Sequence, residues 1–249
     1  MIPQIEKIKE NSRKIYDKLT EPKIVKISIY VSLLTFLPGL IIGLVVALII
    51  GPPGYNLLYN YISDLGSIIY TPAPYILDIT CISTAIFITP LILNLNRLYS
   101  SSQNNLIINS KKEQRLILFR RIFGYCGVVS LFIGVIGMFF VGIFSLDRSP
   151  LGLHYYFSTM TFGGFAIGGF FTGLAIVLKN RVFPKYIGYF MILGPSTATI
   201  LFIIAPDPLT RQFLEWLMMF VSLFWYYLIV LITLQKLNTI LFFDPNFKW

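Results

Sequence analysis

The stretch YNLLYNYISDLGSIIYTPAPY, Tyr55–Tyr75, joins two long apolar runs, and the rest of the chain is organised around it. It contains Asp64 but no lysine or arginine, and Asp78 follows shortly after it. Six aliphatic side chains lie within it: Leu57, Leu58, Ile62, Leu65, Ile68 and Ile69. This apolar content favours a segment that folds back onto the protein or into lipid headgroups over a plain connector. We therefore expect a lid or re-entrant segment that brings Ser63 and Asp64 to a polar site.

The composition is that of an integral membrane protein. Of the 249 residues, 56% are hydrophobic and only 12% are charged, and the mean hydropathy is +0.75. A soluble domain has about 25% charged residues. The apolar runs are continuous rather than alternating, which predicts membrane helices and excludes a β-barrel.

Six apolar runs are long enough to cross a bilayer, since a crossing helix needs about 20 residues. The predicted crossings are 27–50, 74–97, 116–144, 153–178, 186–205 and 211–234. The fold class predicted is thus an all-α bundle of six transmembrane helices. It occupies residues 27–235 and includes an outer loop, 51–74.

Two further segments flank the predicted bundle. A leader, residues 1–26, has isoleucines near one helical face and lysines around the rest, which is typical of an amphipathic helix on a membrane surface. A solvated, partly frayed leader is the alternative. A tail, residues 236–249, follows the last crossing, and the Ser/Asn-rich segment 98–115 is predicted to be flexible.

The basic residues predict how the chain is oriented. Eighteen of the 20 lysines and arginines fall on one side of the predicted crossings, and only Arg148 and Arg211 fall on the other. By the positive-inside rule both termini are cytoplasmic, and we expect the cell membrane as the location. The net charge of +9 then reflects topology and attraction to anionic lipids, so nucleic acid is not expected as a partner.

The acidic residues show the complementary pattern. Five of them lie at the outer ends of the crossings, together with the single histidine: Asp64, Asp78, Asp147, Asp207, Glu215 and His154. Ionisable groups near the apolar zone are costly and are usually paired or functional. The candidate catalytic residues are Ser63, Asp64, Asp78, Asp147 and His154. The candidate substrate-binding residues are Arg148, Arg211, Asp207 and Glu215.

Three kinds of site use these residue types. Ser63 as nucleophile, with His154 as base and an aspartate to orient it, makes an acyl-transfer site. The aspartates and His154 together are ligands for a divalent cation, although one histidine is too few for a His-rich zinc site. The same groups also suit the binding of a lipid headgroup without turnover. Whether the protein is an enzyme stays open, and no metal or cofactor is assigned.

Structural roles compete with these functions. Asp78 is placed to form a salt bridge with Arg148 or Arg211, and His154 to form a hydrogen bond at a helix start. Arg211 and Glu215 are one helical turn apart and are predicted to pair. In the sequence PDPLT, Asp207 is predicted to cap a helix whose first residue is Pro208. Tyrosines and Trp216 at the same level are typical of an aromatic belt.

Two segments carry a resemblance to a known family. YISDLG, Tyr61–Gly66, and VGIFSLDRSPLGLH, Val141–His154, resemble the six-helix membrane family catalogued as domain of unknown function 998. More distantly, the chain resembles DRAM-like proteins and a GPI-anchor lipid-remodelling factor. The resemblance implies six crossings, lipid or lipid-anchor handling, and an outer-leaflet site built from Ser63, Asp64, Asp147 and His154.

We therefore expect a multi-pass protein whose outer-leaflet polar pocket binds a lipid or a lipid-linked anchor, and whose enzymatic version remodels it. The alternative is a non-enzymatic accessory or scaffold subunit of a larger membrane complex. Expected partners are membrane lipids and, in the alternative, other membrane subunits. Four glycines in the fourth crossing permit close helix packing: Gly164, Gly168, Gly169 and Gly173.

Overall fold

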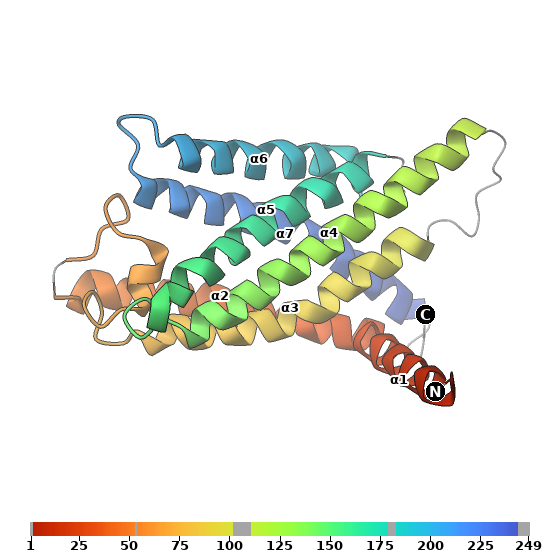
Figure 1. The fold of residues 1–249 in the computed structure, drawn as a ribbon, viewed down its shortest axis with the longest axis horizontal. Coiled ribbons are helices and arrows are strands. Elements are labelled where there is room, and N and C mark those ends of the chain that lie inside the picture. Colours follow the sequence, from red (N-terminus) through yellow and green to blue (C-terminus); the bar gives the residue numbers. More distant parts are fainter. Residues whose placement is uncertain (1, 53, 102–110, 179–182, 244–249) are drawn as a thin grey trace.

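The structure, a computed structural model, describes residues 2–52, 54–101, 111–178 and 183–243. Within these ranges the regular structure is entirely helical (Figure 1). The elements in chain order are α1 (Ile2–Leu19), α2 (Pro22–Ile50), η1 (Ile62–Gly66), α3 (Tyr75–Ser101), α4 (Lys111–Ile143), η2 (Pro150–Gly152), α5 (Leu153–Val177), α6 (Lys185–Ile204) and α7 (Arg211–Phe243). The elements η1 and η2 are short 3-10 helices.

Six of the described helices, α2 to α7, are long and apolar enough to cross a membrane. The protein is therefore a multi-pass membrane protein, and the predicted six-helix all-α class is confirmed. The crossing helices alternate in direction, so η1, η2 and the α6–α7 connection lie at one end of the bundle, here called the η1 end (Figure 1). The start of α1 and the end of α7 lie at the opposite end, here called the terminal end.

Several helices continue past the predicted crossings at the terminal end. α2 begins at Pro22 rather than at 27, α4 at Lys111 rather than at 116, and α7 continues to Phe243 rather than stopping at 234. Apolar runs mark the part of a helix that lies in lipid, whereas the backbone hydrogen bonds continue through polar turns beyond it. Residues 102–110 of the Ser/Asn-rich segment, 179–182 of the basic turn and 244–249 of the tail lie outside the described residues.

Helices that follow one another in the chain also pack against one another, from α2 on α3 through α6 on α7. The most extensive contact joins α4 and α5. A Cβ added at Gly164 would lie 2.3 Å from the backbone nitrogen of Gly134, and one added at Gly173 would lie 2.7 Å from the carbonyl oxygen of Gly188 in α6. The backbones therefore meet without a side chain between them. The packing role predicted for Gly164 and Gly173 is confirmed.

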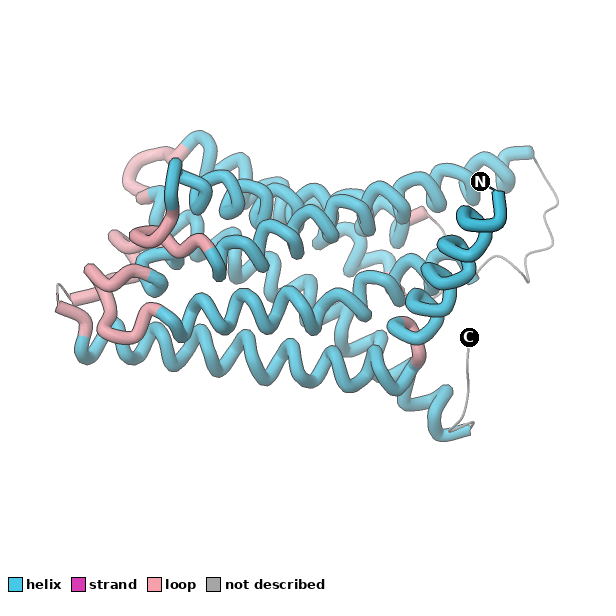
Figure 2. The backbone as a smooth tube through the Cα atoms, turned by 60° about the horizontal axis from the view of Figure 1, so that its bottom comes forward, coloured by secondary structure: helices cyan, strands magenta, loops and turns pink. Residues whose placement is uncertain are grey.

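Contact between α2 and α7 closes the ring of helices over a short stretch. The hydroxyl groups of Ser32 in α2 and Tyr226 in α7 share a hydrogen bond of 2.8 Å. The bundle is therefore tight along α4 and α5 and looser between α2 and α7. Figure 2 shows the connections of the η1 end gathered on one side and α1 lying across the other.

The helix α1 is docked on the terminal end of α3. Arg97 forms an ion pair with Asp17, and its guanidinium lies 5.3 Å from the centre of the Tyr16 ring. Ile8 and Ile15 are exposed on the part of α1 that these contacts leave uncovered. The leader is thus helical over Ile2–Leu19 with an exposed apolar face, and its place on a membrane surface stays a prediction.

Candidate functional site

The turn η1 is seated inside the η1 end of the bundle, in contact with α2, α3 and α7. Asp64 is only 5% exposed, and its Oδ2 accepts hydrogen bonds from the Asn60 side chain at 3.1 Å and from the Tyr61 backbone nitrogen at 2.9 Å. The carboxylate thus caps the first turn of η1. Three of the aliphatic side chains in the same stretch are exposed: Leu58, Ile68 and Ile69. The segment therefore folds back onto the protein as predicted, with one side packed inward and the other facing out.

The surroundings of η1 disfavour negative charge. Burial raises the pKa of Asp64 above its ordinary value, although the hydrogen bonds from Asn60 and Tyr61 oppose this shift. Burial also raises the pKa of Tyr55, and the charges of Asp64 and Glu215 add to that rise. The end of the bundle around η1 is therefore poorly solvated and rich in carboxyl groups.

Two side chains tie the start of the loop to α7. The Trp216 indole nitrogen donates to the carbonyl oxygen of Asn60 at 3.1 Å, and the Thr210 hydroxyl donates to that of Leu58. Trp216 is buried. Its predicted place in an aromatic belt is therefore wrong, because the indole hydrogen bond points into the protein instead of toward lipid headgroups.

The start of α7 differs from the prediction. Thr210 accepts a hydrogen bond from the backbone nitrogen of Phe213 at 3.2 Å and caps the helix, which begins at Arg211. Asp207 is exposed in the preceding loop, so the predicted cap at Asp207 is wrong. The Thr210 hydroxyl accepts from the first turn of α7 and donates to the Leu58 carbonyl. It therefore caps the helix in place of Asp207, which lies farther from the helix start. The structure does not bring Asp207 to the other candidate residues.

A charged cluster fastens η1 to the connection between α4 and α5. The Arg148 Nη2 atom donates to Asp78 Oδ2 at 2.6 Å and to the carbonyl oxygen of Gly66 at 3.1 Å. Asp147 Oδ2 accepts from the Ile68 backbone nitrogen at 2.7 Å. Burial lowers the pKa of Arg148, but the hydrogen bonds and charges of Asp78 and Asp147 outweigh it and raise the pKa. The predicted Asp78–Arg148 salt bridge is confirmed, and catalytic roles for Asp78 and Asp147 stay predictions.

His154 is buried in the first turn of α5. Its Nδ1 lies 2.8 Å from the carbonyl oxygen of Phe144, which can only accept, so Nδ1 carries the proton. In the neutral imidazole, Nε2 then accepts from the Ser158 hydroxyl at 3.3 Å. The predicted hydrogen bond at the helix start is confirmed. Ser158 was missed from the sequence, where its signal is the spacing of four residues from His154 on one helical face.

Some of the predicted catalytic residues share one small crevice between η1, α3, α4 and α5. The polar residues that line it are Ser63, Asp78, Ser145 and His154. Asp64 and Asp147 instead bond to the loop backbone on either side of η1. The structure therefore brings three of the five catalytic candidates, Ser63, Asp78 and His154, to one crevice, and their catalytic roles stay predictions.

The cation site considered from the sequence is not formed. Within the described ranges, which include Asp64, Asp78, Asp147 and His154, no three His, Cys, Asp or Glu side chains are grouped so that they could hold a metal ion. Arg148 occupies the position beside Asp78 and Asp147 that a cation would need. We therefore do not propose a metal centre from these residues.

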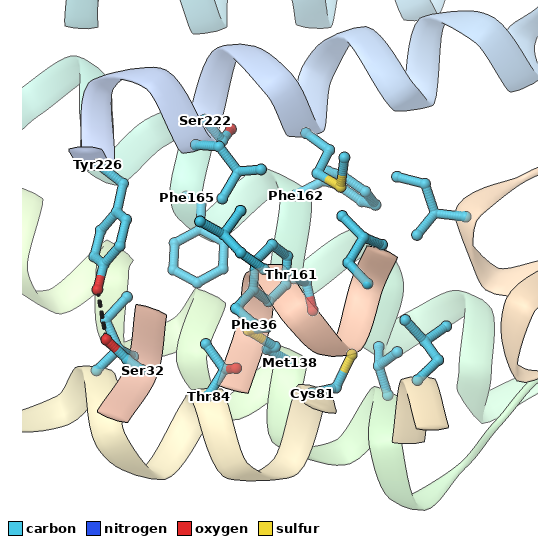
Figure 3. A pocket seen from close by; sticks show the side chains of 18 of the residues that line it. Ser32, Phe36, Cys81, Thr84, Met138, Thr161, Phe162, Phe165, Ser222 and Tyr226 are labelled. Carbon is cyan, nitrogen blue, oxygen red and sulfur yellow. Dashed lines mark hydrogen bonds between the residues drawn. The ribbon is translucent and has the colours of Figure 1, made fainter. Parts of the chain in front are cut away.

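A larger apolar cavity of about 290 Å³ lies inside the ring of helices, with walls from α2, η1, α3, α4, α5 and α7. Figure 3 shows Thr84 and Ser222 on opposite walls, with Phe162 and Phe165 between them. Three polar residues line the cavity near the η1 end: Ser63, Ser158 and Glu215. The Ser32–Tyr226 hydrogen bond lies toward the other end of the cavity, ~16 Å from Glu215 along α7 at ~1.5 Å per residue.

The cavity opens sideways between α2 and α7. Leu37 of α2 and Tyr227 of α7 both line it, yet they are 41% and 48% exposed. The surface between these two helices faces the hydrocarbon of a bilayer, since both are membrane-crossing helices. The cavity therefore reaches the surface of the bundle between α2 and α7.

Glu215 differs from the other carboxyl groups of the η1 end. It lines the cavity, is 8% exposed, and its Oε2 atom has no hydrogen-bond partner. The predicted ion pair with Arg211 is not among the salt bridges of the described residues, because Arg211 is exposed at the first residue of α7 while Glu215 lies against the interior. Burying an unpartnered polar oxygen is costly, which marks Glu215 as a ligand-binding candidate.

No family model, curated protein or solved structure matches this chain. The resemblance carried by Tyr61–Gly66 and Val141–His154 therefore stays a prediction.

Proposed function

We propose that this protein binds a lipid, or a lipid-linked anchor, in the cell membrane. The apolar chain of the ligand occupies the central cavity, and its polar head lies at Ser63, Ser158 and Glu215. The η1 end then faces the outer leaflet, in line with the distribution of basic residues. The observation that carries the proposal is one cavity that is apolar along its length, polar at one end and open to the bilayer at its side.

The dimensions of the cavity favour a single hydrocarbon chain. Its volume of about 290 Å³ is at the lower limit of ligand pockets, which measure roughly 300–1,000 Å³. Its length of ~16 Å along α7 is about half the hydrocarbon thickness of a bilayer, ~30 Å. A ligand from one leaflet can therefore extend its chain through the cavity without leaving the depth of that leaflet.

Filling the cavity tests the proposal. Thr84→Phe places a ring in the cavity wall, and Thr197→Phe makes the same exchange at an exposed position of the membrane helix α6. We expect the purified protein to be labelled by a photoreactive monoacylglycerol, the Thr84→Phe variant to be labelled about tenfold less, and the Thr197→Phe variant to match the parent chain. Equal labelling of both variants, with both folded by thermal melting, contradicts the proposal.

A second candidate function, remodelling of the bound lipid, is favoured by the pair formed by His154 and Ser158. The acceptor nitrogen of His154 faces the Ser158 hydroxyl, and that hydroxyl lines the cavity. In an acyl transfer, Ser158 Oγ attacks the ester carbonyl carbon of the lipid while His154 Nε2 takes the hydroxyl proton. His154 then returns the proton to the departing alcohol, and water hydrolyses the acyl-enzyme. The Phe144 carbonyl orients the imidazole.

Labelling with a long-chain fluorophosphonate separates the two serines as nucleophiles. We expect covalent labelling of the parent chain, its loss in Ser158→Ala and His154→Ala, and its retention in Ser63→Ala. Loss in Ser63→Ala alone assigns the nucleophile to Ser63, as the sequence suggested. The absence of labelling in the parent chain contradicts the catalytic step and leaves lipid binding to be judged by the cavity variants.

The accessory-subunit alternative has lost part of its support. Gly164, Gly168 and Gly173, whose spacing suggested a helix-packing surface, contact α4 and α6 of the same chain. The surface they make is therefore already covered. The exposed apolar face of α1 still favours a contact outside the bundle, with a membrane surface or another subunit.

A further inference from the structure

We propose that Glu215 selects the head of the bound lipid, so that the cavity prefers a single-chain amphiphile with an amine head. The inference rests on the proposed function and names the chemical class of its ligand. Glu215 is more than nine-tenths buried, lines the cavity and has an Oε2 atom without a hydrogen-bond partner. A hydrogen-bond donor on the ligand supplies the partner that the protein does not.

The other carboxyl groups of the η1 end are already engaged by the protein. Asp64 accepts from Tyr61, Asp78 is paired with Arg148, and Asp147 accepts from Ile68. Glu215 accepts from the Ile62 backbone, but its Oε2 atom has no partner, so it is the carboxyl oxygen that a ligand in the cavity can reach. The Asp64 and Glu215 charges both act on the Tyr55 hydroxyl, which places the two carboxyls near one another.

The cationic side chains nearby do not form an ion pair with Glu215. No lysine or arginine is among the described residues that line the cavity. Arg148 donates to Asp78 and to the Gly66 carbonyl, and Arg211 is exposed. His154 donates from Nδ1 to Phe144, so its neutral imidazole accepts at Nε2 from the Ser158 hydroxyl, which lines the cavity. The polar end of the cavity thus offers acceptors, and a carboxylate or phosphate head would add negative charge to an acid-rich, poorly solvated site.

An ammonium head fits this site best. It carries several N–H donors, and a hydrogen bond from a charged donor is roughly twice as strong as one between neutral groups. Ser63 and the Ser158 hydroxyl lie at the same end of the cavity and accept the remaining N–H groups. An alcohol of the same chain length offers only one donor, so it binds less strongly.

The test is competition by dodecylamine, dodecanol and dodecanoate against the photoreactive monoacylglycerol, with the full chain in nanodiscs near neutral pH. We expect the amine to compete at about tenfold lower concentration than the alcohol, and the acid to be the weakest. Glu215→Gln keeps the shape of the side chain and replaces one carboxyl oxygen by an NH2 group, which donates and cannot accept. It is expected to abolish the advantage of the amine over the alcohol. Glu10→Gln, the same exchange at an exposed carboxyl of α1, is expected to keep that advantage.

Three results separate the possible failures. If the three compounds compete equally in the parent chain, or if the acid is the strongest, head selection by Glu215 is overturned while lipid binding stands. If the amine keeps its advantage in Glu215→Gln, the preference has another source and the inference is again overturned. If the photoreactive lipid does not label the parent chain, the proposed function fails and this inference fails with it.

Discussion

Replacing Gly164 by alanine will force α4 and α5 apart, whereas the same replacement at the neighbouring Gly163 will not. A Cβ at Gly164 would lie 2.3 Å from the nitrogen and 2.5 Å from the Cα of Gly134, and 2.9 Å from the carbonyl oxygen of Ser130. These are backbone atoms, which cannot move aside as a side chain can. A Cβ at Gly163 has nothing within 4 Å. The two positions are adjacent in one helix, so each is the control for the other.

The expected energies follow from two opposing effects. Alanine is favoured over glycine inside a helix by roughly 1 kcal/mol, and this gain applies at both positions. Overpacking costs about 1–3 kcal/mol in well-packed interiors, and contact with backbone belongs at the upper end of that range. Gly164→Ala should therefore destabilise the protein by about 2 kcal/mol, while Gly163→Ala stabilises it by up to about 1 kcal/mol.

The measurement is the free energy of unfolding in detergent, with the thermal midpoint as a second readout. A difference of about 3 kcal/mol corresponds to ~6–12 °C in midpoint for a chain of this size, at ~2–4 °C per kcal/mol. Two variants that agree within about 1 kcal/mol would refute the close contact between α4 and α5.

Three further predictions concern the η1 end and the orientation of the chain. Arg148→Met leaves Asp78 without its cation and should cost about 2–3 kcal/mol of stability, less than the ~3–5 kcal/mol of a fully buried pair because the Arg148 side chain is 33% exposed. Adding Asp78→Asn should restore part of the thermal midpoint, and equal losses in the single and double variants would contradict the ion pair. Burial raises the folded-state pKa of Asp64, so its contribution to stability is fully present below the ordinary carboxyl pKa of about 3.9 and is lost as the pH rises through the raised value. Asp64→Asn should therefore reduce the fall of the thermal midpoint with rising pH, and an unchanged profile of midpoint against pH counts against the burial. With cytoplasmic termini, an impermeant maleimide should label Tyr59→Cys in intact cells and Ser12→Cys only after permeabilisation, and the reverse pattern would invert the topology.

The crossings were predictable because a membrane imposes a simple requirement on sequence. Every backbone group in the hydrocarbon must bond within its own helix, so each crossing appears as one long apolar run. The inward packing of η1 was predictable for a related reason, because Leu65 and its aliphatic neighbours would be costly to leave in water. Helix boundaries at the terminal end were missed where polar turns continue a helix beyond the apolar run, as in α4 and α7.

The details of the site depend on side-chain directions, which spacing alone does not determine. Arg211 and Glu215 have the spacing of an ion pair, but one is at the exposed start of α7 and the other is covered by η1. Ser158 is one of many hydroxyl residues in membrane helices. Its importance follows only from the Phe144 carbonyl, which fixes the His154 proton on Nδ1. Neither fact is visible without the arrangement of α4, α5 and η1.

The carboxyl groups at the η1 end separate into two kinds by their partners, and this difference decides which of them matter to a ligand. Asp64, Asp78 and Asp147 each accept hydrogen bonds that hold the loop or η1 in place, so removing one should disturb the fold before it disturbs binding. Glu215 also accepts a hydrogen bond from the backbone of Ile62 in η1, but its Oε2 atom has no partner, so that oxygen is buried at a cost that the fold does not offset. A buried polar group whose partner is missing from the fold is explained when the partner arrives with the ligand. Variants of Glu215 should therefore alter lipid selectivity and lower the thermal midpoint less than variants of the three aspartates, which should disturb the fold first.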